Sequence, residues 1–448
     1  MSFKDWFRDR TIRKVAKYGL PAALGKFVNA ISGLVTLAIL TRYLGPGPFG
    51  VIAMIRTVVT VVDSYANFNT WQAIIKYGTE AIANQRPDDV KRIIKLSFII
   101  DVSTAVLGAL VVVGAAMIVP GQFGWSSHEA ALCAAYGITL VTKVSGTSDG
   151  IFRLCDAYRV QAITAGVSAI TMTLLVVLAV ALDASFESCV FALILGEVLS
   201  NIATTISALW VASKSGYGGW RRSDLRQVRT TFPGVVRFFV STNAQLTVRT
   251  TQNEMDMIVV GSMLGRESAG LFRVAKQVGT IPGRIYFPFE LVLFTELARC
   301  AARRDYKAFR GLLVRAVSIA ATGALVIWLV ASIAARPMIE VVAGAEFVSV
   351  ADAFRFYLLA MGIQLCSMTI QRSMIALGRP GTLFLFDFAS LLVVIVAAVI
   401  GAQQWGLVGV AVAIVLHKAV QLVWSSAVVW RLLRQFEAET AAAAAPAP

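Results

Sequence analysis

The chain carries LGPGPFG at residues 44–50 and LGRESAG at residues 264–270, so the pattern Leu-Gly-x-x-x-x-Gly occurs once in each half. Six residues past each closing glycine stands a cation, Arg56 in the first copy and Lys276 in the second. Both cations follow apolar stretches long enough to belong to membrane helices. The repeat therefore predicts two equivalent lobes, each holding a positive charge where charge is costly.

The composition indicates a membrane protein. Of the 448 residues, 57% are hydrophobic and only 15% are charged, whereas soluble domains carry about 25% charged residues. Stretches of about 20 apolar residues, the length needed to cross a bilayer, recur along almost the whole chain. Residues 1–19 are basic and amphipathic, and the apolar run after them lacks a small-residue cleavage site, so we expect it to be the first span. The predicted fold class is an all-α integral membrane protein.

Hydropathy and charge together predict twelve transmembrane helices with both termini cytoplasmic. We place them at residues 20–40, 50–75, 94–118, 129–149, 160–182, 188–212, 234–263, 269–293, 312–335, 352–377, 381–402 and 406–430. The seventh is polar in its first half, and the alternative for it is a surface helix. A span is favoured because it leaves nearly all loop cations on the cytoplasmic side, and because the repeat requires six spans in each half. The loop cations on the opposite side are Arg42, Arg266, Arg273 and Arg336.

The predicted domains follow from this topology. They are a basic cytoplasmic segment at 1–19, an N-terminal six-helix lobe at 20–212, a polar, glycine-containing linker at 213–232, a C-terminal six-helix lobe at 233–430 and a cytoplasmic tail at 431–448. Six is an even number, so the lobes form a parallel repeat with the substrate expected at their interface. The Ala/Pro-rich tail is expected to be disordered.

Cations inside the predicted spans carry the functional argument. They are Lys26, Arg56, Lys143, Arg249, Lys276, Arg284, Arg315, Arg355, Arg372 and Lys418. Arg315, Arg355 and Arg372 lie near span ends, where long side chains reach water. A cation at mid-bilayer costs about 2.5–3.5 kcal/mol even on a lenient scale. Two interpretations stay open for the others: structural ion pairs with acids in the spans, or the lining of a hydrated central cavity.

A positive cavity suits a phosphorylated ligand, because ammonium and guanidinium groups form charge-assisted hydrogen bonds to phosphate. The side chains we expect to bind a diphosphate are Lys26, Arg56, Lys276, Arg249 and Arg284. Those expected to contact sugar hydroxyls are Asn29, Asn67, Asn243 and Asn253. Candidate ion-coupling acids are Asp63, Asp101, Glu197, Asp256 and Asp387, each of which has a structural partner as its alternative role. Such a lining favours a lipid-linked, phosphorylated sugar over a cationic drug.

Other chemistries find little support in the sequence. Five cysteines are scattered singly, and neither His128 nor His417 has an obvious metal or nucleophile partner. No phosphate-binding loop is present, so nucleotide hydrolysis is disfavoured. We therefore expect no cofactor and no metal. The net charge of +15 is explained by the basic cytoplasmic loops, so nucleic acid is not an expected partner.

Five stretches in order resemble one family. LTRYLGPGPFG at 40–50 is similar to the first-loop signature of polysaccharide-biosynthesis (O-antigen-type) flippases. DMIVVGSMLGRESAGLF at 256–272, FTELA at 294–298, AGAEF at 343–347 and ALGR at 376–379 resemble the family's later motifs. Each motif is loose alone, but the ordered set, which covers about residues 20–430, is specific.

The resemblance implies membership of the multidrug/oligosaccharidyl-lipid/polysaccharide exporter superfamily. It implies two six-helix bundles in a V shape that work by alternating access in the bacterial inner membrane. The implied substrate is a polyprenyl-diphosphate-linked oligosaccharide, moved from the cytoplasmic to the periplasmic leaflet, with glycosyltransferases and a polymerase of the same pathway as partners. In relatives, cavity cations on helices one, two and eight meet the diphosphate, and the nearest matches are Lys26, Arg56 and Lys276, with lysine at two positions where arginine is common.

Two other functions remain as alternatives. A multidrug or cation antiporter of the same fold needs acids to dominate the cavity, which the cations within the spans disfavour. A membrane polysaccharide polymerase or ligase needs a sizeable outer domain or loop with acid/base residues, and the predicted outer loops are short.

Overall fold

The computed structural model describes residues 10–444 except 69, 119 and 227, and within this part of the chain helices account for nearly every residue and no strand occurs. It divides into two compact units, Met1–Glu254 and Met255–Pro448. The helices of the first unit are α2 (Arg10–Leu44), α3 (Pro46–Ala66), α4 (Trp71–Ala83), α5 (Pro87–Ile118), α6 (Pro120–Phe123), α7 (Ser127–Tyr136), α8 (Ile138–Val141), α9 (Ser145–Leu154), α10 (Tyr158–Ala181), α11 (Phe186–Ala212) and α12 (Val228–Thr231). Helix α13 (Val235–Gly279) runs across the boundary between the units.

The two copies of the glycine motif adopt the same backbone conformation. Gly45, between α2 and α3, has φ 72° and ψ 178°. Gly265, which interrupts α13, has φ 82° and ψ 179°. Only glycine reaches this region without strain, and Pro46 starts the helix after the first copy. The first copy separates α2 from α3, and the second copy makes an equivalent break within α13.

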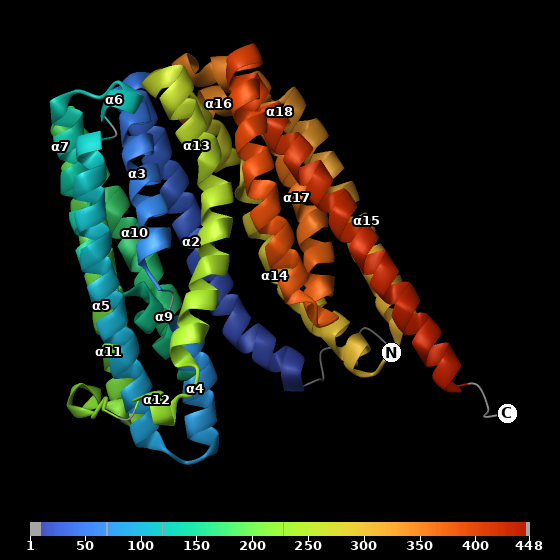
Figure 1. Cartoon of the computed structure of the whole chain (residues 1–448). Coiled ribbons are helices and arrows are strands. Elements are labelled where there is room, and N and C mark those ends of the chain that lie inside the picture. Colours follow the sequence, from blue (N-terminus) through green and yellow to red (C-terminus); the bar gives the residue numbers. More distant parts are fainter. Residues whose placement is uncertain (1–9, 69, 119, 227, 445–448) are drawn as a thin grey trace. The chain divides into compact units, whose positions relative to one another are not determined.

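Two helices expected to be continuous in the first unit are interrupted. The prediction of one helix at 50–75 is wrong: α3 ends at Ala66, Asn67 is extended with φ −87° and ψ 115°, and α4 begins at Trp71. The segment predicted at 129–149 is likewise divided into α7, α8 and α9. Figure 1 shows α3 ending partway along the unit with α4 beyond it. Periodic apolar residues continue through both breaks, which is why hydropathy did not reveal them.

The linker is anchored to the first unit rather than loose. Trp220 is buried among Val90, Ile94 and Phe152, and its ring lies 4.9 Å from that of Phe98 on α5. The Lys95 ammonium donates to the Ser223 carbonyl over 2.6 Å. These contacts fix the segment that leads from α11 to α12 and α13.

The first half of α13 packs within the first unit. Val235 and Phe239 belong to a core cluster with Ile74 and Tyr77 of α4. The Thr247 hydroxyl donates to the Ser64 carbonyl over 2.6 Å. The structural boundary therefore falls at Glu254 and Met255, whereas the sequence placed the end of the N-terminal lobe at residue 212.

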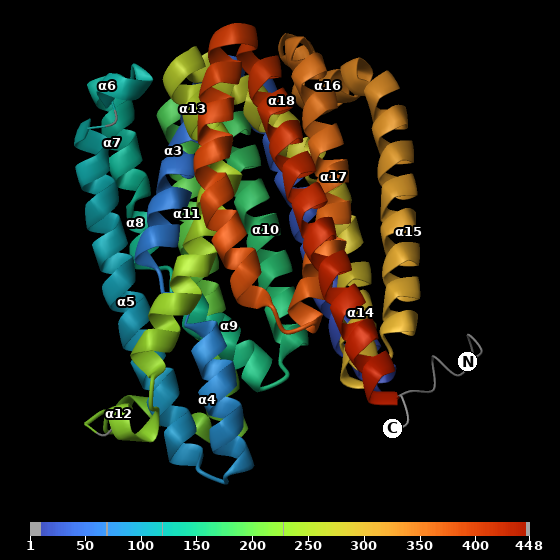
Figure 2. The same ribbon diagram turned by 45° about the vertical axis from the view of Figure 1, so that its right-hand side comes forward.

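The second unit contains α14 (Ile281–Ala302), α15 (Tyr306–Ile333), α16 (Ala335–Ala343), α17 (Ala351–Ala376) and α18 (Pro380–Ala444). Helices α15 and α17 run side by side in Figure 2. Helix α18 is interrupted at Trp405 and Gly406, where the chain turns back. Residues 431–444, expected to be disordered, are helical because alanine favours helix and the Phe436 ring stacks on Tyr306 at 5.1 Å. Residues 445–448 of the tail lie outside the described residues.

Eight helical segments of the described chain are long and apolar enough to cross a membrane. The chain is therefore a multi-pass membrane protein. The segments predicted at 129–149, 234–263 and 269–293 are not among the eight, and those at 381–402 and 406–430 fall within one of them. The broken helices and the polar first half of α13 explain this difference, and the twelve-span topology and the cytoplasmic termini stay predictions.

Candidate functional site

A row of polar side chains crosses the interior of the first unit, and we refer to it as the polar stripe. Its members are Arg56, Asp63 and Asn67 at and beyond the C-terminal half of α3, Lys143 between α8 and α9, and Glu197 and Asn201 of α11. The members on α3 are spaced by seven and four residues and those on α11 by four, so each set shares one helix face. The stripe is set against the buried apolar side chains of α3, which include Ile52 and Ile55.

Arg56 joins α3 to α11 by an ion pair. Its Nη2 lies 2.9 Å from Oε1 of Glu197. The two side chains are 37% and 25% exposed, so the protein does not fully enclose either partner. The Glu254 carboxylate, on the part of α13 within this unit, adds to the negative potential at the guanidinium. Arg56 is therefore a partly exposed cation that is paired with an acid of the same unit.

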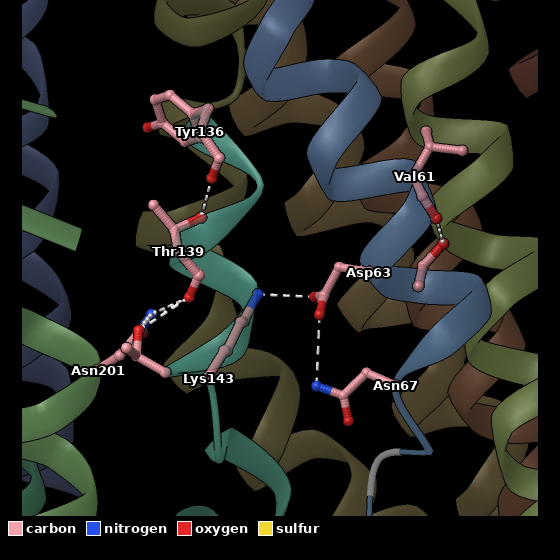
Figure 3. Close-up of polar contacts among 9 residues, drawn as sticks. Val61, Asp63, Asn67, Tyr136, Thr139, Lys143 and Asn201 are labelled. Atoms are coloured by element: carbon pink, nitrogen blue, oxygen red, sulfur yellow. Dashed lines mark hydrogen bonds and ion pairs between the residues drawn. The ribbon is translucent and has the colours of Figure 1, made fainter. Parts of the chain in front are cut away.

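A second ion pair lies further along the same face of α3. The Lys143 ammonium donates to Oδ2 of Asp63 over 2.7 Å, and the Asn67 amide approaches Oδ1 at 3.4 Å (Figure 3). The Lys143 and Asp63 side chains are 35% and 18% exposed. Asn67 stands where α3 ends and Lys143 where α8 ends, so the two helix breaks meet at this pair.

Asn201 ties α11 to the broken helix. Its amide nitrogen donates to the Thr139 carbonyl over 3.0 Å and to the Thr142 hydroxyl over 3.2 Å. The Thr139 hydroxyl donates in turn to the Tyr136 carbonyl over 2.8 Å (Figure 3). These bonds satisfy backbone groups that the breaks release and that hydrocarbon cannot satisfy. They also hold Lys143 in place beside Asp63.

Asp101 of α5 is fully buried beside the stripe and joins the two helix restarts. One oxygen accepts from the Thr70 hydroxyl over 2.8 Å, and the other accepts from the Thr147 amide over 2.6 Å. These donors stand at the N-termini of α4 and α9, where a negative charge is stabilised. A side chain at Gly146 would come within 2.6 Å of the Thr70 hydroxyl. Asp101 thus serves as a structural joint, and its proposed role in ion coupling stays a prediction.

The second unit holds its own ion pairs. The Lys276 ammonium lies 2.7 Å from Oδ1 of Asp256, across the turn at Gly265, with side chains only 10% and 8% exposed. Arg372 of α17 pairs with Glu290 of α14. The buried Asp387 accepts from the Gln421 amide over 3.1 Å. Lys276 is therefore enclosed, in contrast to Arg56.

The remaining predicted site residues are more scattered. The side chain of Lys26 lies outside the described residues. Those of Asn29, Asn253 and Arg284 are exposed, Arg249 is half-buried and Asn243 is buried. The structure brings Arg56 to Glu197, Lys276 to Asp256 and Asn67 to Asp63, always within one unit. Convergence of the predicted cations on one chamber stays a prediction.

Two members of the stripe were missing from the predicted site. Lys143 was recognised as a span cation but was not selected, because the break after α8 leaves no trace in hydropathy. Asn201 carried a usable signal: it lies four residues after Glu197 in an otherwise apolar helix, so the two polar groups share a face.

Comparison with known proteins gives the chain its context. Residues 16–298 match the family model described as polysaccharide biosynthesis protein. A curated relative, inner membrane protein YghQ of Escherichia coli (strain K12), is 24% identical over 362 residues, which cover 78% of this chain and 98% of the relative.

Solved structures of transporters share the fold. The lipid II flippase MurJ in an inward closed conformation is 16% identical with a TM-score of 0.67, covering 93% of this chain and 89% of its own. A point mutant of the Vibrio cholerae MATE transporter VcmN is 14% identical with a TM-score of 0.65, covering 94% of this chain and 97% of its own. Because the family model matches more than half of its residues, the chain belongs to the polysaccharide biosynthesis protein family.

Proposed function

We propose that the protein is a flippase that moves polyprenyl-diphosphate-linked oligosaccharide repeat units from the cytoplasmic to the periplasmic leaflet of the bacterial inner membrane by alternating access. The observation that carries the proposal is the pair of half-exposed cations, Arg56 and Lys143, in the polar stripe of a unit built from apolar helices. Family membership and the MurJ-like fold support it.

The energetics of the half-exposed pairs favour ligand exchange. A solvent-accessible ion pair contributes about 0–1 kcal/mol to stability. A phosphate oxygen can take the place of the carboxylate on Arg56, because a guanidinium forms charge-assisted hydrogen bonds to both groups.

The ligand's other parts have matching surfaces. Asn67, which lies beside the Asp63–Lys143 pair, remains a proposed sugar contact. Asn29, Asn243 and Asn253 remain proposed sugar contacts, and Lys26, Arg249, Lys276 and Arg284 remain proposed diphosphate ligands. The lipid tail stays in the bilayer, since each span offers apolar side chains to it.

The test is a leaflet assay in cells that depend on this gene. Deletion should accumulate lipid-linked repeat units on the cytoplasmic side and remove the surface polysaccharide, and the wild-type gene should restore it. Unchanged polysaccharide and unchanged precursors after deletion would contradict the proposal. Partnership with glycosyltransferases and a polymerase follows from the same proposal, since they make and consume the substrate.

A second candidate is a multidrug or cation antiporter. It is favoured by the fold shared with VcmN and by the acids Asp63, Glu197, Asp256 and Asp387. In the structure Asp63, Glu197 and Asp256 are engaged by cations, which lowers their attraction for a cationic drug. A changed drug-sensitivity profile in the deletion strain, without a polysaccharide defect, would favour this candidate instead.

A further inference from the structure

The accessible cation Arg56 is never bare, because an acid of the same unit occupies it. Glu197 lies 2.9 Å away on α11, and Glu254 adds negative potential. The guanidinium that would receive a phosphate is thus already engaged by a carboxylate. An anionic headgroup therefore competes with Glu197 for this guanidinium.

A membrane contains abundant anionic phospholipids that compete with the proposed substrate for such a site. Phosphodiester lipids such as phosphatidylglycerol carry one negative charge and are present in large excess over any lipid-linked sugar. A bare, water-accessible guanidinium within a bilayer would bind these headgroups through the same charge-assisted hydrogen bonds. The diphosphate of a lipid-linked sugar carries about two charges and more acceptor oxygens, so its intrinsic binding is stronger.

We propose that Glu197 is an internal competitor that keeps the Arg56 site free of singly charged phospholipid headgroups. An internal competitor lowers the apparent affinity for every anion by the same factor. The weaker, singly charged ligand then falls below the occupancy that its concentration in the membrane would otherwise give. The ratio of the two affinities stays the same, but the stronger diphosphate still displaces the carboxylate at concentrations at which the singly charged headgroup no longer does. The inference rests on the proposed function, since it assumes that Arg56 binds a diphosphate.

The geometry fits a competitor better than a structural clamp. A clamp is most effective when both partners are buried and fully hydrogen-bonded, as for Lys276 and Asp256 at 10% and 8% exposure. The Arg56 and Glu197 side chains are 37% and 25% exposed. Lys143 and Asp63 repeat the arrangement two helical turns along α3. Two half-exposed cations, each matched to one carboxylate, leave the stripe without net charge until a ligand arrives.

The test measures binding to the purified full-length protein in nanodiscs of phosphatidylcholine. One probe is phosphatidylglycerol and the other is a short-chain prenyl-diphosphate-linked N-acetylglucosamine. In Glu197→Gln and Glu197→Ala we expect phosphatidylglycerol to bind about fivefold more tightly, which corresponds to about 1 kcal/mol for a half-exposed pair. Phosphatidylglycerol should then inhibit binding of the diphosphate probe in these variants, and only weakly in the wild type.

Two further variants separate the outcomes. Glu187→Gln makes the same change on the same helix outside the stripe, where Glu187 pairs with His128 at 3.0 Å, and should behave as wild type. Arg56→Gln should lose most of the binding of the diphosphate probe. If Arg56 is needed for that probe but neither Glu197 variant gains affinity for phosphatidylglycerol, the inference fails and the proposed function stands. If the wild type binds the diphosphate probe no better than Arg56→Gln does, the proposed function fails as well.

Discussion

Arg56 in the first unit and Lys276 in the second both stand six residues past the closing glycine of a motif, and each pairs with an acid, Glu197 or Asp256, yet the two pairs differ in their exposed fraction. Their N–O distances are similar, 2.9 and 2.7 Å. The first pair has side chains 37% and 25% exposed, whereas the second has 10% and 8%. Equivalent cations in a repeat can therefore have different surroundings, and we propose ligand exchange at Arg56 and a structural role at Lys276.

The difference follows from desolvation. A charge already in contact with water loses little when it changes partners. A buried charge that loses its partner keeps the full cost of its removal from water. Lys276 was predicted to be a ligand equal to Arg56, and we now propose that it binds a headgroup only if its surroundings open.

The largest effect on stability is expected from Lys276→Met. The Asp256 carboxylate then keeps its burial and loses the ammonium, which should lower the free energy of unfolding by about 3–5 kcal/mol. Thermal unfolding of the purified protein measures this. The double variant Lys276→Met with Asp256→Val should recover most of the loss, because an apolar pair removes both buried charges. A single variant as stable as the wild type would show that the pair is not buried as described.

A smaller effect is expected from Thr70→Val. Thr70 and Asp101 are both 0% exposed, and valine removes the hydroxyl that donates to the carboxylate. Leaving a buried acceptor short of one donor costs about 1–3 kcal/mol. Thr104→Val on α5 is the control, because its hydroxyl bonds only to helix carbonyls that already accept backbone bonds. Equal unfolding temperatures for the two variants would contradict the role of Asp101 as the residue that joins the two helix restarts.

The smallest effect on stability is expected from Lys143→Gln. The Lys143 and Asp63 side chains are 35% and 18% exposed, so the loss should stay within about 1 kcal/mol. Transport should nevertheless fall, since the second cation of the polar stripe is gone. Surface polysaccharide is measured beside the unfolding temperature. A large loss of stability with normal transport would place this pair with Lys276–Asp256 rather than with Arg56–Glu197.

Sequence reasoning recovered the helical class and the family because both depend on long patterns. Apolar runs, the glycine motif and the ordered signatures can be recognised without knowing which residues contact one another in the fold. The residue type at Gly45 and Gly265 also indicates their backbone conformation, since only glycine adopts it freely. Arg56 could be selected from the sequence because it stands six residues past the closing glycine of the first motif.

The rest of the site depended on contacts that no local pattern encodes. Arg56 and Asp63 are seven residues apart on α3, and each binds a partner from a distant part of the chain, Glu197 or Lys143. Lys143 reaches Asp63 because α3 and α8 both end close to this pair. The apolar pattern of the sequence continues past both helix ends, so hydropathy does not reveal them. Exposure could not be deduced from sequence, so Lys276 and Arg56 looked alike.

The most direct measurement of the central claim is transport of lipid-linked oligosaccharide by Arg56→Gln, in cells lacking the wild-type gene, with membrane insertion and unfolding temperature recorded in parallel. We predict that the variant inserts, that its stability changes by no more than about 1 kcal/mol, and that repeat units accumulate on the cytoplasmic leaflet. Wild-type transport by Arg56→Gln at equal protein levels would contradict the claim that this half-exposed cation receives the headgroup.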